Sequence, residues 1–248
     1  MKIKENIPNA ITCSNLLCGS VAIIKIFEND LALASCFVGL AVIFDFMDGF
    51  AARMLKVSSP IGKDLDSLAD MVTFGVVPGM MMFQLFSMQQ INSQETELDF
   101  ERIPYLKYIS FLITIFSAIR LAKFNNDVRQ NNSFIGLATP ANTIFICSIP
   151  LIIKFQPDLF LENPRVGLIL LSNAGLTLIV IISSFLLVSK LPLFALKFAS
   201  FGWNGNQIRY VFLCLSLLML VFLQFVGIPL IIILYVLLSI LNNLTKKT

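Results

Sequence analysis

The chain has 248 residues, 57% of them hydrophobic and 13% charged, and a mean hydropathy of +0.84, far above that of a soluble globular domain. The formal charge of +3, with basic residues spread along the chain, argues against a nucleic-acid-binding protein. The absence of histidine excludes His-dependent catalytic triads and His-ligated zinc, and leaves acid–base chemistry to carboxylates, Lys, Tyr or Cys.

Apolar stretches of membrane-spanning length recur along the chain. A hydrocarbon core about 30 Å thick takes about 20 apolar residues as helix, and we predict spans at 9–27, 31–52, 65–88, 105–122, 139–155, 166–189, 210–225 and 227–245. The break between the last two, at 226–229, is weakly marked, and 139–155 is short, so seven spans is the alternative. The sequence therefore predicts an all-α, polytopic integral membrane bundle of about eight helices.

The distribution of Lys and Arg predicts the orientation of these spans. With eight spans and a cytoplasmic N-terminus, thirteen basic residues lie on the cytoplasmic side and five outside, as the positive-inside rule favours. Both termini are therefore expected in the cytoplasm. No small-residue cleavage site follows the first apolar run, so we interpret that run as a span and not as a signal peptide.

No repeat or linker divides the chain into parts. We therefore expect a single membrane domain over residues 1–248, with residues 1–8 as an interfacial lead-in to the first span.

Acidic residues at helical spacing interrupt the second and third predicted spans. Asp45 and Asp48 share one helical face near the end of the second span, and Asp66 and Asp70 share one face at the start of the third. On the predicted topology both pairs lie at the cytoplasmic ends of neighbouring antiparallel helices. A carboxylate at membrane depth costs about 2.5–3.5 kcal/mol on insertion scales unless it faces a polar cavity or a partner.

Divalent cations would offset the repulsion among four converging carboxylates. Oxygen ligands without Cys or His favour Mg²⁺, Mn²⁺ or Ca²⁺, and two such ions about 3.5–4 Å apart commonly assist displacement at phosphorus. Gly49 and Gly62 would leave backbone open to a bulky ligand beside the aspartates, although tight helix packing is the alternative for each glycine. For the aspartates, the alternative is a structural ion-pair cluster or the ion pathway of a cation or proton-coupled transporter.

The full pattern over residues 45–70, Asp-x2-Asp-Gly-x2-Ala-Arg-x8-Gly-x3-Asp-x3-Asp, resembles the signature of the CDP-alcohol phosphatidyltransferase family at every defined position. Residues 15–19, 66–78, 119–125 and 134–141 also resemble the phosphatidylserine synthases of that family. The chain departs from the usual pattern of that group at Lys123, where Arg is common, and at Ala138, where Pro is common.

The resemblance implies a role in phospholipid biosynthesis. The phosphatidyl group of CDP-diacylglycerol would be transferred to the hydroxyl of L-serine, with release of CMP. The resemblance implies that Asp45, Asp48, Asp66 and Asp70 ligate two divalent ions, Mg²⁺ or Mn²⁺, and that Asp70 also takes the serine hydroxyl proton. It further implies a homodimer in the cell membrane with the active site facing the cytoplasm.

Substrate-binding residues follow from the same resemblance. Gly49, Ala52 and Gly62 would let the cytidine nucleotide approach the helix backbones, and Arg53 would face the nucleotide or the headgroup region, with membrane anchoring as its alternative role.

The acceptor pocket is a separate expectation, at the inner ends of the fourth and fifth spans. A cation there could hold the serine carboxylate, although contacts with inner-leaflet phosphates are the alternative. The residues concerned are Arg120, Lys123, Asn125, Thr139 and Asn142. Glycerol 3-phosphate, inositol phosphate or choline are the alternative acceptors.

Overall fold

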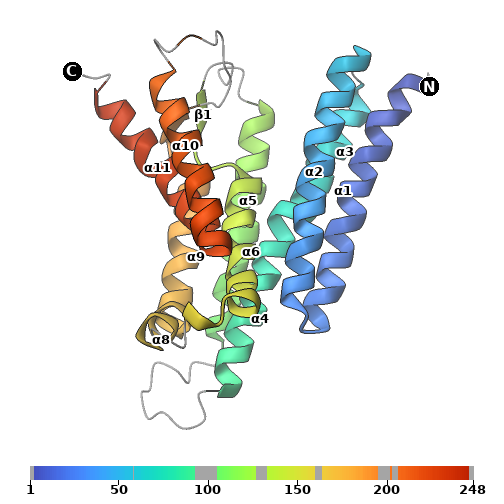
Figure 1. The fold of residues 1–248 in the computed structure, drawn as a ribbon. Helices are drawn as coiled ribbons and strands as arrows, with labels where there is room; N and C mark the ends of the chain where they lie inside the picture. The colour runs from blue at the N-terminus through green and yellow to red at the C-terminus, as the bar shows by residue number, and fades with distance from the viewer. Residues whose placement is uncertain are drawn as a thin grey trace.

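The computed structural model describes residues 3–57, 59–92, 105–126, 133–159, 164–194, 202 and 206–245. Within these ranges the protein is a bundle of helices with one small two-stranded ladder (Figure 1). In chain order the elements are α1 (Ile3–Phe27), α2 (Leu31–Leu55), α3 (Pro60–Asp70), the π-helix η1 (Met71–Val76), α4 (Val77–Asn92), the 3-10 helix η3 (Leu106–Ser110), α5 (Phe111–Asn126), β1 (Ser133–Ile135), α6 (Thr139–Phe155), α8 (Pro164–Leu171), α9 (Asn173–Val188), β2 (Pro192–Phe194), α10 (Gln207–Leu223), the 3-10 helix η4 (Gln224–Val226) and α11 (Gly227–Thr245).

Several helical stretches of the described chain are long and apolar enough to cross a membrane, which agrees with the predicted all-α membrane class. Four qualify singly: Asn6–Phe27, Leu31–Leu55, Pro60–Gln89 and Gln207–Leu244. They contain the first three and the last two predicted spans. α6 coincides with the prediction at 139–155, whereas the predicted span 105–122 is a 3-10 turn followed by α5, which runs on to Asn126. The count of eight spans stays a prediction.

The last apolar stretch folds back on itself. The ring centroids of Phe212 and Tyr235 lie 5.6 Å apart, whereas a straight helix would separate the two residues by about 34 Å. The turn is made by η4, where Gln224 has a φ of 49°. Gln156 at the end of α6 holds this turn, because its amide donates to the Leu223 carbonyl at 3.2 Å and accepts from the Val226 amide at 3.0 Å. α10 and α11 therefore form an antiparallel hairpin.

The predicted continuous span 166–189 is broken in the structure. α8 and α9 meet at an angle of 58°. Ser172 begins α9 as its N-cap, with its hydroxyl accepting from the Gly175 amide at 3.0 Å. A serine that caps a helix satisfies the free amides of a new helix start, so the local sequence favours a break here over one straight helix.

The interfacial lead-in expected over residues 1–8 stays a prediction, and the structure shows that residues 3–8 are helical. They are the first turns of α1, which continues without interruption to Phe27; residues 1 and 2 lie outside the described part.

The buried core runs through the middle of the bundle. Its fully buried members come from α1, α2, α4, α5, α6 and α9, among them Ile26, Val38, Phe86, Ile113 and Leu187. Many large apolar side chains are instead exposed on the outer faces. In the most apolar 18-residue stretch of α10–α11, only 6% of the residues are buried. Such an outer surface suits lipid contact.

The start of α2 is anchored at the lower end of the bundle in Figure 1. Asp30 caps α2 by accepting from the Leu33 amide at 3.1 Å, and it forms an ion pair with Lys154 of α6 at 3.3 Å. The Leu33 amide, and then Lys154, hold the pKa of the Asp30 carboxyl below its usual range. α2 is thereby tied to α6.

A short antiparallel ladder lies at the upper end of the view in Figure 1, beside α10. Ser133 of β1 pairs with Phe194 of β2, and Ile135 pairs with Pro192. The Tyr235 hydroxyl of α11 donates to the Phe194 carbonyl at 2.9 Å. The sequence analysis did not predict these strands, because three residues are too few to show a strand periodicity.

Candidate active site

The turn between α2 and α3 brings the two aspartate pairs together. α2 stops at Lys56, which adopts a left-handed conformation (φ 53°) while its amide bonds the Ala52 and Arg53 carbonyls. α3 starts after Ser59, whose hydroxyl accepts from the Gly62 amide at 3.0 Å, and Pro60 occupies its first turn. The helix stop and the new cap reverse the chain at one end of the bundle.

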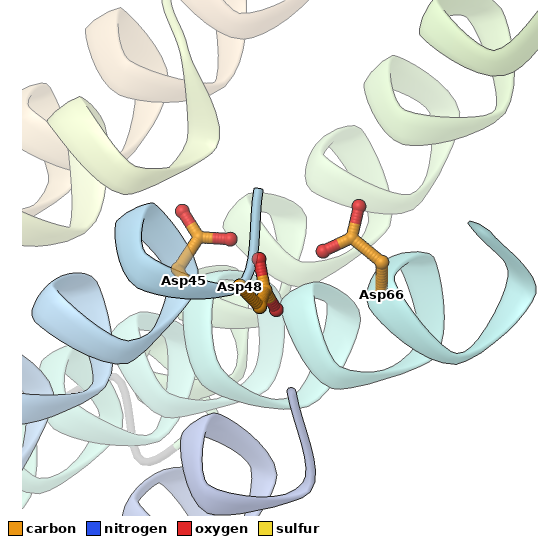
Figure 2. Close-up of side chains that lie close together, drawn as sticks. All are labelled: Asp45, Asp48 and Asp66. Atoms are coloured by element: carbon orange, nitrogen blue, oxygen red, sulfur yellow. The ribbon is translucent and has the colours of Figure 1, made fainter. Parts of the chain in front are cut away.

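Three of the predicted carboxylates form a compact group. Asp45, Asp48 and Asp66 each place a carboxylate oxygen within 4.8 Å of the others. Figure 2 shows Asp45 and Asp48 of α2 opposite Asp66 of α3, with Asp48 between the other two. Asp70, one turn further along, is in hydrogen-bonding contact with Asp45. The structure therefore brings all four predicted aspartates to one place, with Asp70 at the edge of the group.

Helix α1 packs against both α2 and α3 and contributes side chains that the sequence analysis did not assign to the site. The Thr12 hydroxyl donates to Asp48 Oδ2 at 2.6 Å, and Asn15 Nδ2 donates to Asp70 Oδ1 at 3.4 Å. The sequence analysis expected the two aspartate-bearing helices to be neighbours. In the structure α1 also lies against both of them. Pro8, Thr12, Asn15 and Gly19 follow an i, i+4, i+7, i+11 pattern, and this stripe of small and polar residues was the signal available in the sequence.

A cavity of about 230 Å³ opens beside the carboxylates. Asp48 and Asp66 line it together with Gly49, Ala52 and Gly62, which are three of the four residues predicted to bind CDP-diacylglycerol. The sequence analysis missed the wall from α1, made by Pro8, Asn9 and Thr12, and also Lys63 of α3.

Arg53, the fourth residue predicted for the donor, is exposed at the end of α2. Its Nε donates to the Gly49 carbonyl of its own helix at 3.0 Å, and it is not among the residues that line the cavity. In this conformation Arg53 lies along the last turn of α2, where a cation complements the helix dipole.

The two glycines of the motif differ in their surroundings. A Cβ at Gly49 would have no heavy atom within 4 Å, whereas one at Gly62 would meet Asn9 Oδ1 at 2.9 Å and Ser59 Oγ at 3.0 Å. Gly49 therefore leaves open space for a ligand, while Gly62 both lines the cavity and allows α1 and α3 to approach closely.

Arg120 of α5 is a second neighbour of Asp70, besides Asn15 of α1. Its side chain is 8% exposed, it interacts electrostatically with Asp70, and its Nε has no hydrogen-bond partner among the described residues. Thr139 and Asn142, at the start of α6, are 1% and 0% exposed, and the Thr139 hydroxyl and both amide atoms of Asn142 also lack partners in the described part of the chain. Buried polar groups normally find partners, so these three residues are candidates for polar contacts that the described residues do not supply.

Lys123 and Asn125, also predicted for the acceptor pocket, lie in a different environment from Arg120. Both are exposed at the end of α5. Asn125 Nδ2 donates to the Ser67 hydroxyl at 2.8 Å, and its carbonyl accepts from Lys63 Nζ at 3.4 Å. Asn125 therefore connects α5 to α3.

The donor set at the carboxylate group fits a hard divalent cation. All the grouped side chains offer oxygen, and carboxylates this close repel each other unless a cation or a proton lies between them. Arg53 is turned onto a backbone carbonyl and Arg120 lies toward Asp70, so the nearby arginines do not neutralise Asp45, Asp48 and Asp66 directly. The arrangement can hold divalent cations next to a cavity of a size suited to a phosphorylated ligand.

A comparison with known proteins tests the family resemblance. The profile of the family described as CDP-alcohol phosphatidyltransferase matches residues 5–240. The chain belongs to this family. The resemblance inferred from residues 45–70 is thereby confirmed, and the chain is a member of a family of membrane phosphatidyltransferases.

Curated relatives show which named proteins the chain is similar to. The chain is 33% identical over 135 residues to the CDP-diacylglycerol–serine O-phosphatidyltransferase of Bacillus subtilis, covering 54% of this chain and 69% of that protein. It is 33% identical over 141 residues to the protein of the same name from Helicobacter pylori strain J99, covering 56% and 54%. It is 28% identical over 145 residues to the archaetidylserine synthase of Methanothermobacter thermautotrophicus, covering 57% and 56%. The chain thus spans little more than half the length of the last two.

Proposed function

We propose that the protein is a phosphatidylserine synthase, which transfers the phosphatidyl group of CDP-diacylglycerol to the hydroxyl of L-serine and releases CMP. The observation that carries this proposal is the group formed by Asp45, Asp48 and Asp66, two of which line the cavity that also reaches Gly49 and Gly62. The names of the relatives support serine as the acceptor.

The donor would occupy the cavity between α1, α2 and α3. Its cytidine diphosphate would lie against the exposed backbone at Gly49, with Lys63 at the cavity wall available to the phosphates. Its acyl chains would remain in the lipid and enter sideways between helices, since removing them from the bilayer is costly. The cavity would thus hold the phosphorus atom beside the carboxylates, and positioning of this kind supplies much of the rate in phosphoryl transfer.

The four aspartates would hold two divalent ions, Mg²⁺ or Mn²⁺. When bound, such ions neutralise the diphosphate and stabilise the departing CMP. The residues of the chain fix where this happens: Thr12 orients Asp48 through its 2.6 Å bond, and Asn15 orients Asp70. Orientation of ligating carboxylates by such hydrogen bonds is typical of metal sites.

Serine would approach Asp70 from the side of α5 and α6. Arg120 would bind the serine carboxylate by charge-assisted hydrogen bonds, and Thr139 and Asn142 would offer their unpaired polar atoms to the amino acid. Asp70 would accept the hydroxyl proton as the serine oxygen bonds to phosphorus and the bond from phosphorus to CMP breaks. Lys123 would contribute charge at the rim of this region.

The membrane arrangement belongs to the same proposal. We propose a single domain over residues 1–248 with about eight spans, both termini in the cytoplasm, and an active site that faces the cytoplasm of the cell membrane. The start of α1, the end of α11 and the turn between α2 and α3 all lie at the upper end of the bundle in Figure 1, which supports this topology. A homodimer is proposed from the family resemblance alone.

Release of CMP tests the function. Purified protein in detergent with CDP-diacylglycerol and Mn²⁺ or Mg²⁺ is expected to release CMP when serine is added, and not when glycerol 3-phosphate, inositol phosphate or choline replaces it. Asp66→Asn is the inactive control. No CMP with any acceptor would refute the enzyme assignment and favour a transporter, and CMP only with glycerol 3-phosphate would refute serine as the acceptor.

A further inference from the structure

A π-helix follows the aspartate motif without a break. η1 (Met71–Val76) starts at the residue after Asp70, and its Thr73 and Phe74 are fully buried. π-helices are rare, and they occur mostly as single wide turns near functional sites. The aspartate-bearing helix α3 and the core helix α4 are therefore joined through a wide turn whose central residues are buried.

The sequence explains why the helix widens here. Pro78 has no amide hydrogen, so in a regular α-helix it could not donate to the Phe74 carbonyl four residues earlier, and its ring would crowd that carbonyl. The wide turn exposes carbonyls that neighbouring helices bind. The Thr143 hydroxyl of α6 donates to the Phe74 carbonyl at 3.1 Å, shared with the Thr139 carbonyl at 2.9 Å, and the Thr114 hydroxyl of α5 donates to the Gly75 carbonyl at 3.0 Å.

η1 is also held against α1. The Thr73 hydroxyl donates to the Asn15 carbonyl at 3.3 Å, and a Cβ at Gly19 would collide with the Thr73 hydroxyl. Asn15 is the residue whose amide reaches Asp70. The position of η1 is therefore coupled through α1 to the carboxylate group.

The extra residue of a π-turn changes the direction in which α3 presents its side chains. One residue corresponds to about 100° of rotation about a helix axis, so Asp66 and Asp70 face differently, relative to the core residues of α4, than they would in a continuous α-helix. The largest of these core residues, Met82 and Phe86, are fully buried and fix α4 in the bundle. The orientation of the two aspartates consequently depends on η1 keeping its wide form.

We propose that Thr143 and Thr114 are positioning residues for the carboxylate group. By donating to the carbonyls of η1 they hold the π-turn, and the π-turn sets Asp66 and Asp70 against Asp45 and Asp48. This inference rests on the proposed function, because it assumes that the carboxylates bind divalent cations. Neither threonine is assigned a contact with substrate.

Binding of Mn²⁺ alone, without either substrate, tests the inference. Thr143→Val keeps the shape of the side chain and removes the hydroxyl; it is expected to weaken Mn²⁺ binding by about 10- to 100-fold, the usual effect of losing a group that orients metal ligands. Thr143→Ser restores the hydroxyl and should bind as the wild type does. Thr177→Val is the matched control, because the Thr177 hydroxyl donates to a carbonyl of its own helix α9 at 2.6 Å. Free Mn²⁺ is measured by electron paramagnetic resonance, with melting temperatures recorded in parallel.

The outcomes separate the two proposals. A Thr143→Val protein that melts earlier but binds Mn²⁺ like the wild type would overturn the positioning role and leave the proposed function intact. If wild-type protein bound no Mn²⁺, the metal site of the proposed function and this inference would both be wrong. If Thr143→Val does not fold, Thr114→Val removes the bond to the Gly75 carbonyl and must show the same loss of affinity; unchanged affinity there would refute the inference.

Discussion

Replacing Arg120 tests the acceptor pocket most directly. Arg120→Ala removes a guanidinium that is 8% exposed and has an unpaired Nε among the described residues, so water can replace little of its interaction with a bound carboxylate. A hydrogen bond to a charged group contributes about 1.5–3 kcal/mol. At about 1.36 kcal/mol for each factor of ten, the KM for serine should rise by about 10- to 150-fold.

The assay is CMP release at varied serine with saturating CDP-diacylglycerol, and then the reverse. The KM for CDP-diacylglycerol should change little in Arg120→Ala, because the proposed donor cavity is lined by α1, α2 and α3 and not by α5. Lys123→Ala is the matched control, since this cation is exposed one turn away and should lower serine use far less. An effect of Arg120→Ala confined to the donor KM would refute the reasoning and assign Arg120 to the phosphate site.

Three further predictions concern substitutions at single residues. Asp70→Asn should abolish turnover while keeping metal-dependent nucleotide binding by equilibrium dialysis; near-normal activity would contradict its role as the base. Gly49→Ala should raise the free energy of unfolding by about 0.5–1 kcal/mol, since alanine favours helix. It should also raise the KM for CDP-diacylglycerol, because the added methyl group enters the cavity. An unchanged KM would contradict the donor site. Gln156→Ala should lower the free energy of unfolding by about 1 kcal/mol, and with it the melting temperature, by freeing the α10–α11 turn. An unchanged melting temperature would contradict the role of Gln156 in that turn.

The sequence predicted well those helices for which the length of the apolar stretch is enough to identify a membrane span. α1, α2 and the stretch that begins at Pro60 coincide with predicted spans within a few residues. The break at Ser172 was missed because a capping serine inside an apolar run does not change hydropathy, although it ends one helix and starts another. The π-turn was likewise hidden, since it combines the effect of Pro78 with hydroxyls from helices far along the chain that bind the Gly75 and Phe74 carbonyls.

The carboxylates were predictable because charge inside an apolar helix is rare and their spacing fixes a common face. Thr12 and Asn15 were not assigned to the site because each is an ordinary polar residue at its own position. Their contribution depends on α1 packing against both α2 and α3, and a hydropathy pattern does not show which spans are neighbours. Lys123 was grouped with Arg120 by proximity in sequence, but it lies one turn beyond the buried Arg120, where the end of α5 is exposed.

The stripe on α1 explains how the proposed site is divided between its two substrates. Along one face of this helix, Pro8 lines the cavity, Thr12 binds Asp48, Asn15 binds Asp70, and Gly19 packs on η1. α1 thus lines the proposed donor cavity and also binds two of the carboxylates. Asp70 is held by α1 on one side and interacts with Arg120 of α5 on the other. A group that takes a proton from the acceptor while the donor is bound must stand between the two substrates, and in the proposed function Asp70 would fill that role.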